Sequence, residues 1–241
     1  MRATSIIYRR ELAAYLRSPA GWIVAAAALL IEGILFQIRG LSQEQLSADV
    51  LRQFFWSMSG VTMFAAIILA IRLVAEERQT QSLVLLNTSP VSDLSIVAGK
   101  FLAALTFLGG ILALSVYMPL LIKVNGKITA SQIIVGYLGL WLLGAAYLAI
   151  GLFASALTRH QLLAGVLGAL FGGVMVMFYQ LGKVLDPPFR DVVSHLDAWW
   201  GHFQGGFMIG VISLENVVYY LALTYFFLLL AVKTMEAKRW Q

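Results

Sequence analysis

Six long apolar runs divide this sequence, and they constrain its fold more than any other feature. A helix that crosses the hydrocarbon core of a bilayer needs about 20 mostly apolar residues, with about 17 as a lower limit. The runs lie at residues 21–38, 54–71, 101–122, 133–157, 162–181 and 217–232. The last run is short, but Tyr219, Tyr220 and Lys233 extend it into the interface. Because no strand-like alternation accompanies the runs, we predict an all-α integral membrane protein with six transmembrane helices.

The composition agrees with this class. Of the 241 residues, 60% are hydrophobic and 12% are charged, whereas soluble domains carry about a quarter charged residues. The chain has no cysteine, and its three histidines lack metal-ligand spacing, so neither a disulfide nor a metal centre is expected. Nothing resembles the nucleotide-binding pattern GxxxxGKS or GxxxxGKT. We therefore expect no catalytic residue and no bound cofactor in this chain.

Lysine and arginine are distributed unevenly between the two ends of the predicted spans. The end with both termini has eleven: Arg2, Arg9, Arg10, Arg17, Arg72, Arg78, Lys100, Arg159, Lys233, Lys238 and Arg239. The opposite end has six: Arg39, Arg52, Lys123, Lys127, Lys183 and Arg190. Because basic residues are enriched in cytoplasmic loops, we predict a multi-pass protein of the inner (cytoplasmic) membrane with both termini cytoplasmic. The first run is predicted to be a retained helix, and no nucleic-acid partner is expected.

Residues 1–19 are predicted to form an amphipathic helix at the inner leaflet, ending at the Ser18-Pro19 pair. At about 100° per residue, four aromatic and leucine side chains share one arc: Tyr8, Leu12, Tyr15 and Leu16. Four arginines share the neighbouring arc, where they would lie near lipid phosphates: Arg2, Arg9, Arg10 and Arg17. A plain basic flank that enforces orientation is the alternative interpretation.

Three stretches of the chain resemble a known family. They are "YRRELAAYLRSPAGWI" (8–23), "EERQTQSLVLLNTSPVSDLSIVAGK" (76–100) and "HFQGGFMIGVISLENVVYYLALTYFFLLL" (202–230). They are similar to the basic entry helix, the cytoplasmic signature and the entry to the last span in ABC-2 type ABC transporter permeases. The resemblance is greatest to the gliding-motility branch. It implies one transmembrane domain, residues 1–241, with a type V exporter-like fold.

The resemblance gives a role to residues 72–100, the largest predicted cytoplasmic loop. It implies a short coupling helix that docks in a groove of a separate cytoplasmic ABC ATPase. The residues expected to couple are Glu76, Glu77, Arg78, Thr80, Ser82, Leu83, Leu86 and Pro90. Gln79 replaces the family's glycine and the family's helix acid is absent, so the acidic contact is expected at Glu76 or Glu77. A solvated connector is the alternative, although helix connections are usually about two to eight residues long.

The implied function is that of a permease subunit, whose partner ATPase uses ATP and Mg²⁺ to drive export or extraction of a cargo. A second permease copy or homologue is also implied, together with an auxiliary extracytoplasmic-domain protein in the gliding-motility branch. Two other classes stay open: a self-sufficient secondary transporter or channel, and a non-transporting scaffold for an ATPase. Secondary transporters tend to have broken spans or several embedded ionisable groups. The sequence leaves the cargo and its direction undefined.

Polar and small residues within the spans suggest packing roles. Glu32 is the only acidic residue well inside a predicted span, and we expect it to face the bundle near Arg39 rather than to form a proton relay. Small residues recur at four-residue spacing in the fifth run, which favours close helix packing, with a dimer seam as the alternative. They are Ala164, Gly168 and Gly172.

The segment 182–215 is predicted to be an external, re-entrant segment. It contains Trp199, Trp200 and Phe203, which are expected at the depth of the lipid headgroups. His195, Asp197 and His202 lie nearby, but no serine or cysteine nucleophile is framed by them. We therefore expect no catalytic site there.

Overall fold

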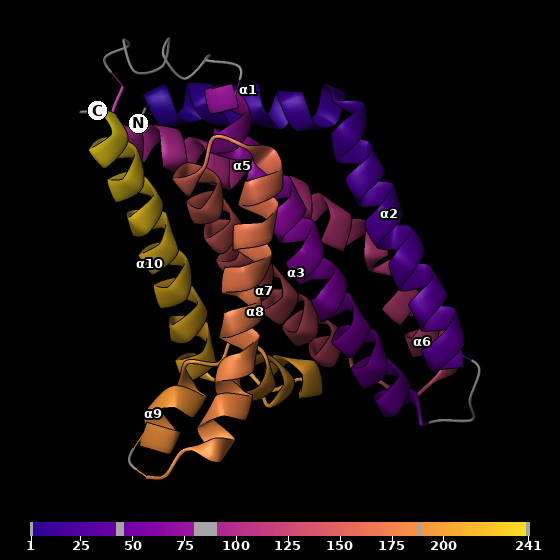
Figure 1. Ribbon diagram of the computed structural model, residues 1–241. Coiled ribbons are helices and arrows are strands. Elements are labelled where there is room, and N and C mark those ends of the chain that lie inside the picture. The colour runs from indigo at the N-terminus through magenta and orange to yellow at the C-terminus, as the bar shows by residue number, and fades with distance from the viewer. Residues whose placement is uncertain (1, 42–45, 80–90, 188, 240–241) are drawn as a thin grey trace.

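The computed structural model describes residues 2–41, 46–79, 91–187 and 189–239 of the chain. The main helices in these ranges are α1 (Arg2–Arg17), α2 (Pro19–Leu35), α3 (Ser47–Gln79), α5 (Asp93–Ser115), α6 (Tyr117–Asn125), α7 (Ala130–Leu157), α8 (Gln161–Val184), α9 (Phe189–His195) and α10 (Leu214–Arg239). Three short helices lie between them in the described ranges: η1 (Phe36–Leu41) between α2 and α3, and η2 (Trp200–Gln204) and η3 (Phe207–Ile209) between α9 and α10. Figure 1 shows α1 lying across one end of a bundle of long helices.

Six segments among the described residues are long and apolar enough to cross a membrane. They are Pro19–Arg39, Ser47–Gln79, Asp93–Val124, Ala130–Leu157, Gln161–Val184 and Leu214–Lys238. Each contains one of the six apolar runs, so the predicted spans are confirmed as helices of suitable length and composition. Helices are expected in these segments because backbone N–H and C=O groups in hydrocarbon must form hydrogen bonds within their own helix.

The Ser18-Pro19 pair makes the corner between α1 and α2, as expected. Ser18 Oγ accepts a hydrogen bond from Ala20 N at 3.3 Å, and Pro19 is the first residue of α2. Proline is tolerated there because its missing N–H would have no intrahelical partner. The corner lets α1 lie across the bundle end while α2 runs along the bundle (Figure 1).

The third span is broken into α5 and α6, which meet at Val116. Pro119 has no N–H to donate to the carbonyl of Ser115, so the helix is interrupted at this point. The Ser115 hydroxyl donates to Leu112 O at 2.8 Å and lies 2.8 Å from the hydroxyl of Tyr137 on α7. The residue before the break is thus in contact with α7.

Helix α7 occupies the centre of the bundle. Of its most apolar window, 78% of the residues are buried, compared with 17% in α8. A Cβ atom at Gly151 would lie 2.7 Å from the Cβ of Ala70, so α3 and α7 approach closely where Gly151 has no side chain. The small residues Ala164, Gly168 and Gly172 form the buried side of α8. The predicted close packing is confirmed.

The segment between α8 and α10 folds back onto the bundle. Trp199 Nε1 donates to Ser59 Oγ at 2.8 Å, and Phe203 is fully buried. Trp200 stacks on Tyr179, with ring centroids 5.8 Å apart. Protein atoms cover Trp199 and Phe203, so both side chains pack within the protein; their position at the depth of the headgroups stays a prediction.

Candidate functional site

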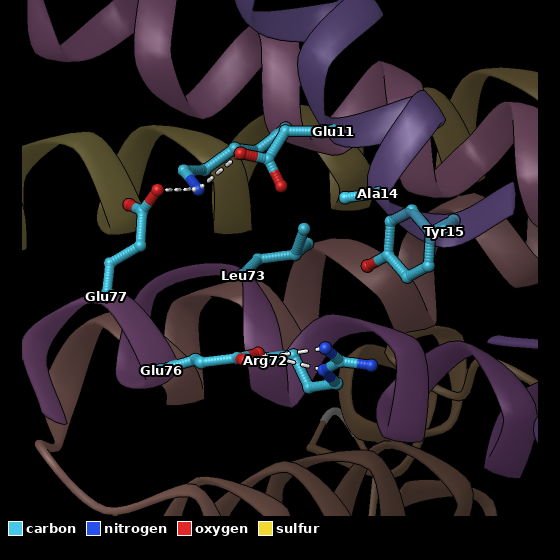
Figure 2. A pocket seen from close by; sticks show the side chains of 8 residues that line it. Glu11, Ala14, Tyr15, Arg72, Leu73, Glu76 and Glu77 are labelled. Carbon is cyan, nitrogen blue, oxygen red and sulfur yellow. Dashed lines mark hydrogen bonds and ion pairs between the residues drawn. The ribbon is translucent and has the colours of Figure 1, made fainter. Parts of the chain in front are cut away.

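The candidate site lies at the end of the bundle where both chain termini and α1 are found, which we call the terminus end (Figure 1). Here α1 meets the last turns of α3 and the first turns of α5. A polar cavity of about 220 Å³ separates them, lined by Glu11, Ala14, Tyr15, Arg72, Leu73, Glu76, Glu77 and Lys100. Figure 2 shows Glu11 and Tyr15 facing the α3 residues Leu73 and Glu77 across this cavity.

Four charged residues from three helices form one connected network beside the cavity, which we call the Lys100 network. Lys100 Nζ lies 3.1 Å from Glu11 Oε1 and 2.9 Å from Glu77 Oε1, and only 1% of the lysine side chain is exposed. Arg10 Nη2 approaches the same two oxygens at 2.6 Å and 2.7 Å. A buried ammonium group is costly unless it is paired, so this geometry explains why Lys100 tolerates its position.

The electrostatics of Glu11 match this arrangement. Burial by itself would raise the pKa of its carboxyl group, but Lys100 and Arg10 outweigh that effect and hold the pKa below its ordinary value. Glu11 is therefore ionised at neutral pH. It links α1 to α5 by charge, through Lys100.

Tyr15 fastens the other end of α1. Its ring stacks on Phe107 of α5 at a centroid distance of 5.2 Å, and its hydroxyl donates to Leu69 O of α3 at 2.8 Å. Tyr15 is buried, so the expectation that this side chain faces the lipid interface is wrong. Arg9 and Arg17 are exposed, as the amphipathic pattern predicts. Tyr15 of the apolar arc thus packs against α3 and α5, whereas Leu16 of the same arc is 49% exposed.

The described residues of the predicted coupling loop already have partners within the chain. Glu77 belongs to the Lys100 network, and Glu76 accepts from Arg72 Nε at 2.8 Å. Arg78 Nη1 donates to Ala156 O of α7 at 2.7 Å. The remaining expected coupling residues, Thr80, Ser82, Leu83, Leu86 and Pro90, lie outside the described residues. Their docking role stays a prediction.

Ser155 is a structural residue that the sequence analysis missed. Its hydroxyl donates to Ile71 O at 2.8 Å and accepts from Val74 N and Ala75 N at 3.1 Å and 2.9 Å. It therefore holds the last turns of α3 against α7. A polar side chain within an apolar span was the available signal, since such residues bond between helices in membranes.

Glu32 faces the bundle, as expected, and is fully buried. Ser57 Oγ lies 3.1 Å from its Oε1 atom, while its Oε2 atom has no hydrogen-bond partner among the described residues. The expected approach to Arg39 is wrong: no ion pair joins them in the described part of the chain, and the Arg39 guanidinium lies 4.9 Å from the ring centroid of Trp56.

We expect Glu32→Gln to change the free energy of unfolding by less than about 1 kcal/mol, because the amide oxygen can still accept from Ser57. Thermal unfolding in detergent micelles measures the change. Transport by reconstituted protein should also persist. Complete loss of transport by a stably folded Glu32→Gln variant would instead show that the carboxyl group acts on the cargo or on a proton.

These features define a multi-span α-helical membrane protein whose charged connections gather at one end. A family model described as "ABC-2 family transporter protein" matches residues 5–188, so the chain belongs to this family of membrane transport components. The match runs from α1 through α8 and includes every member of the Lys100 network. No curated protein matches the chain. Members of the family normally work with a cytoplasmic ATPase.

Proposed function

We propose that this chain is the membrane-spanning permease subunit of an ATP-driven transporter. A separate cytoplasmic ATPase would bind ATP and Mg²⁺, and a second permease copy or homologue would complete the pathway. Cargo would be exported or extracted between the two bundles. Membership of the ABC-2 family supports this role, and the resemblance of residues 202–230 favours a part in gliding motility or cell-surface assembly.

The observation that carries the proposal is the connection made by Lys100. Helix α3 ends at Gln79 and α5 begins at Asp93, so residues 80–92 join two helix ends at the terminus end. Glu77 near the first end and Lys100 near the second are paired with each other and with α1. A force applied to the connecting segment would therefore reach α1, α3 and α5 together.

The charge distribution supports a cytoplasmic position for the terminus end. Eleven of the seventeen basic residues belong to that end in the sequence, which is the bias found in cytoplasmic loops. Arg9 and Arg17 are exposed on α1, where they can contact lipid phosphates while Tyr15 packs inward. This arrangement would place residues 80–90 within reach of a cytoplasmic ATPase.

The test compares Leu83→Asp/Leu86→Asp with the unmodified full-length chain after affinity purification from mild detergent. We expect the unmodified chain to co-purify an ATPase with a phosphate-binding P-loop, identified by mass spectrometry, and to stimulate its ATP hydrolysis in vesicles. The double variant should lose both, because two acids would face an apolar docking groove. Leu46→Asp, at the opposite end of α3 and 76% exposed, is the matched control.

Alanine at Glu76, Glu77 and Arg78 should also release the ATPase, but this result needs a stability measurement beside it. Glu77 and Arg78 hold α1, α5 and α7 to α3, so their loss can act through the fold. ATP-independent transport by the purified chain would contradict the proposal and favour a secondary transporter. ATPase binding without any transport would favour a scaffold.

A further inference from the structure

A second group of charged residues lies at the terminus end, and two of its three members, Arg159 and Lys238, have no role in the function proposed above. It consists of Arg78 at the end of α3, Arg159 in the turn between α7 and α8, and Lys238 near the end of α10, and we call it the basic corner. Arg78 Nη1 and Lys238 Nζ both donate to Ala156 O, at 2.7 Å and 3.2 Å. Arg159 is three residues beyond Ala156 in the chain, in the turn after α7. Three cations from separate elements therefore lie around the C-terminal end of α7.

The turn that carries Arg159 is locally constrained. Thr158 Oγ1 accepts from the backbone N–H of His160 at 3.0 Å, which is a side-chain turn closed around Arg159. Arg159 itself is exposed. The turn thus presents the guanidinium to the surroundings, beside two cations whose positions are set by the end of α7.

The local charges do not balance. The C-terminal end of α7 carries about half a negative charge, and the N-terminal end of α8, three residues on, carries about half a positive charge. In the described part of the chain no acidic side chain makes an ion pair with Arg78, Arg159 or Lys238. Residues 80–90 contain no aspartate or glutamate. The corner therefore has an excess of positive charge that an anion would neutralise.

The surroundings indicate which anion fits. Leu162 follows the turn directly and is 86% exposed, and the most apolar windows of α8 and α10 are only 17% and 22% buried. A ligand at this corner would have its charge beside cations and its body beside exposed apolar helix surface. That chemistry belongs to a phospholipid, and basic pockets between transmembrane helices on the cytoplasmic side bind anionic headgroups.

We propose that the basic corner binds the headgroup phosphate of an anionic phospholipid of the inner leaflet, with its acyl chains along α8 and α10. The orientation is that of the proposed function. Arg159 supplies a planar fork that matches a phosphate, and Lys238 adds a point charge. Because Arg78 is the next-to-last residue of α3, the bound lipid connects the membrane to the start of the coupling segment.

The experiment measures binding to the purified full-length chain in detergent micelles by native mass spectrometry. Phosphatidylglycerol is compared with phosphatidylcholine of the same acyl chains, and inorganic phosphate is added as a competitor. We expect the unmodified chain to prefer phosphatidylglycerol. Arg159→Gln/Lys238→Gln should weaken that preference about tenfold or more. Arg159→Lys/Lys238→Arg, which keeps the charges, should restore it, and Lys233→Gln on the same helix should leave it unchanged.

Three results would overturn the proposal. The first is equal binding of phosphatidylglycerol by the unmodified chain and the double glutamine variant. The second is full displacement of the lipid by inorganic phosphate at millimolar concentration, which would identify a site for the free ion. The third comes from the separate affinity purification described above: loss of the ATPase by Arg159→Gln/Lys238→Gln, with its lipid preference unchanged, would assign the corner to a protein. Because the binding assay contains no ATPase, its failure is distinguishable from failure of the proposed transport role.

Discussion

Replacing Lys100 with methionine is expected to lower the free energy of unfolding by about 3 kcal/mol, near the lower limit for breaking a buried ion pair. Methionine fills a similar volume, so the loss comes from the charge. Glu11 and Glu77 would then face each other with Arg10 as their remaining network partner. Arg10 is half exposed and pairs with both Glu11 and Glu77, so the two carboxylates keep a cationic partner. The expected loss of unfolding free energy is therefore near the lower limit for a buried pair.

The measurement is thermal unfolding of the purified chain in detergent, with Lys233→Met as the control. Lys233 also pairs with a glutamate, at 2.7 Å, but its side chain is 66% exposed, and such surface pairs contribute about 0–1 kcal/mol. Ile7 of α1 is 6% exposed and packs against Gly99 of α5, where a Cβ atom would lie 2.9 Å from the Ile7 Cβ. Because the chain has no cysteine, a single Ile7→Cys change reports on this contact. Thiol labelling should be slow in that background and faster once Lys100→Met is added. Equal unfolding temperatures and labelling rates would show that the network does not fasten α1.

Tyr15→Ala is expected to cost about 3–5 kcal/mol, as for other large aromatic residues removed from a packed site. The change removes the stacked contact with Phe107 and the hydrogen bond to Leu69 O. Tyr15→Phe keeps the ring and loses only the hydroxyl, so it should cost about 1 kcal/mol. Thermal unfolding of the two variants separates the two contributions.

Tyr8 provides the matched control on the same helix. Its hydroxyl lies 3.2 Å from Thr106 Oγ1 in an exposed contact, so Tyr8→Ala should cost much less than Tyr15→Ala. A similar loss of unfolding free energy for Tyr8→Ala and Tyr15→Ala would mean that both tyrosines face lipid. That is the arrangement expected for a helix that only lies at the membrane interface. In that case α1 would not transmit force from the terminus end.

If both results are obtained, α1 is fastened to the ends of α3 and α5, and under the proposed function it would move with them. It would be held at Glu11 by charge and at Tyr15 by packing, and both residues line the cavity in Figure 2. A displacement of the α3 and α5 ends would then tilt α1 in the membrane surface. Arg9 and Arg17, which are exposed, would move relative to the lipid phosphates.

The six spans, the corner at Ser18-Pro19 and the close packing of α8 could all be predicted from the sequence. These follow from local requirements: the thickness of the bilayer, the missing N–H of proline and the small size of glycine and alanine. Each is visible within a stretch of some twenty residues. Family membership was accessible for the same reason, since its motifs are continuous in the chain.

The partners of the charged residues could not be predicted before the packing of the helices was known. Lys100 is 89 residues from Glu11 in the chain, yet they meet at 3.1 Å, and nothing in local periodicity pairs them. The helical periodicity of residues 1–19 placed Tyr15 on the apolar side of α1. It could not show whether that side faces protein or lipid, because both surroundings are apolar. The contacts of Trp199 and Ser155 were not predicted, because their partners come from distant segments of the chain. Trp199 bonds to Ser59, and Ser155 bonds to the end of α3. Which helix ends come together is set by packing around α7, and that packing is a property of the whole chain.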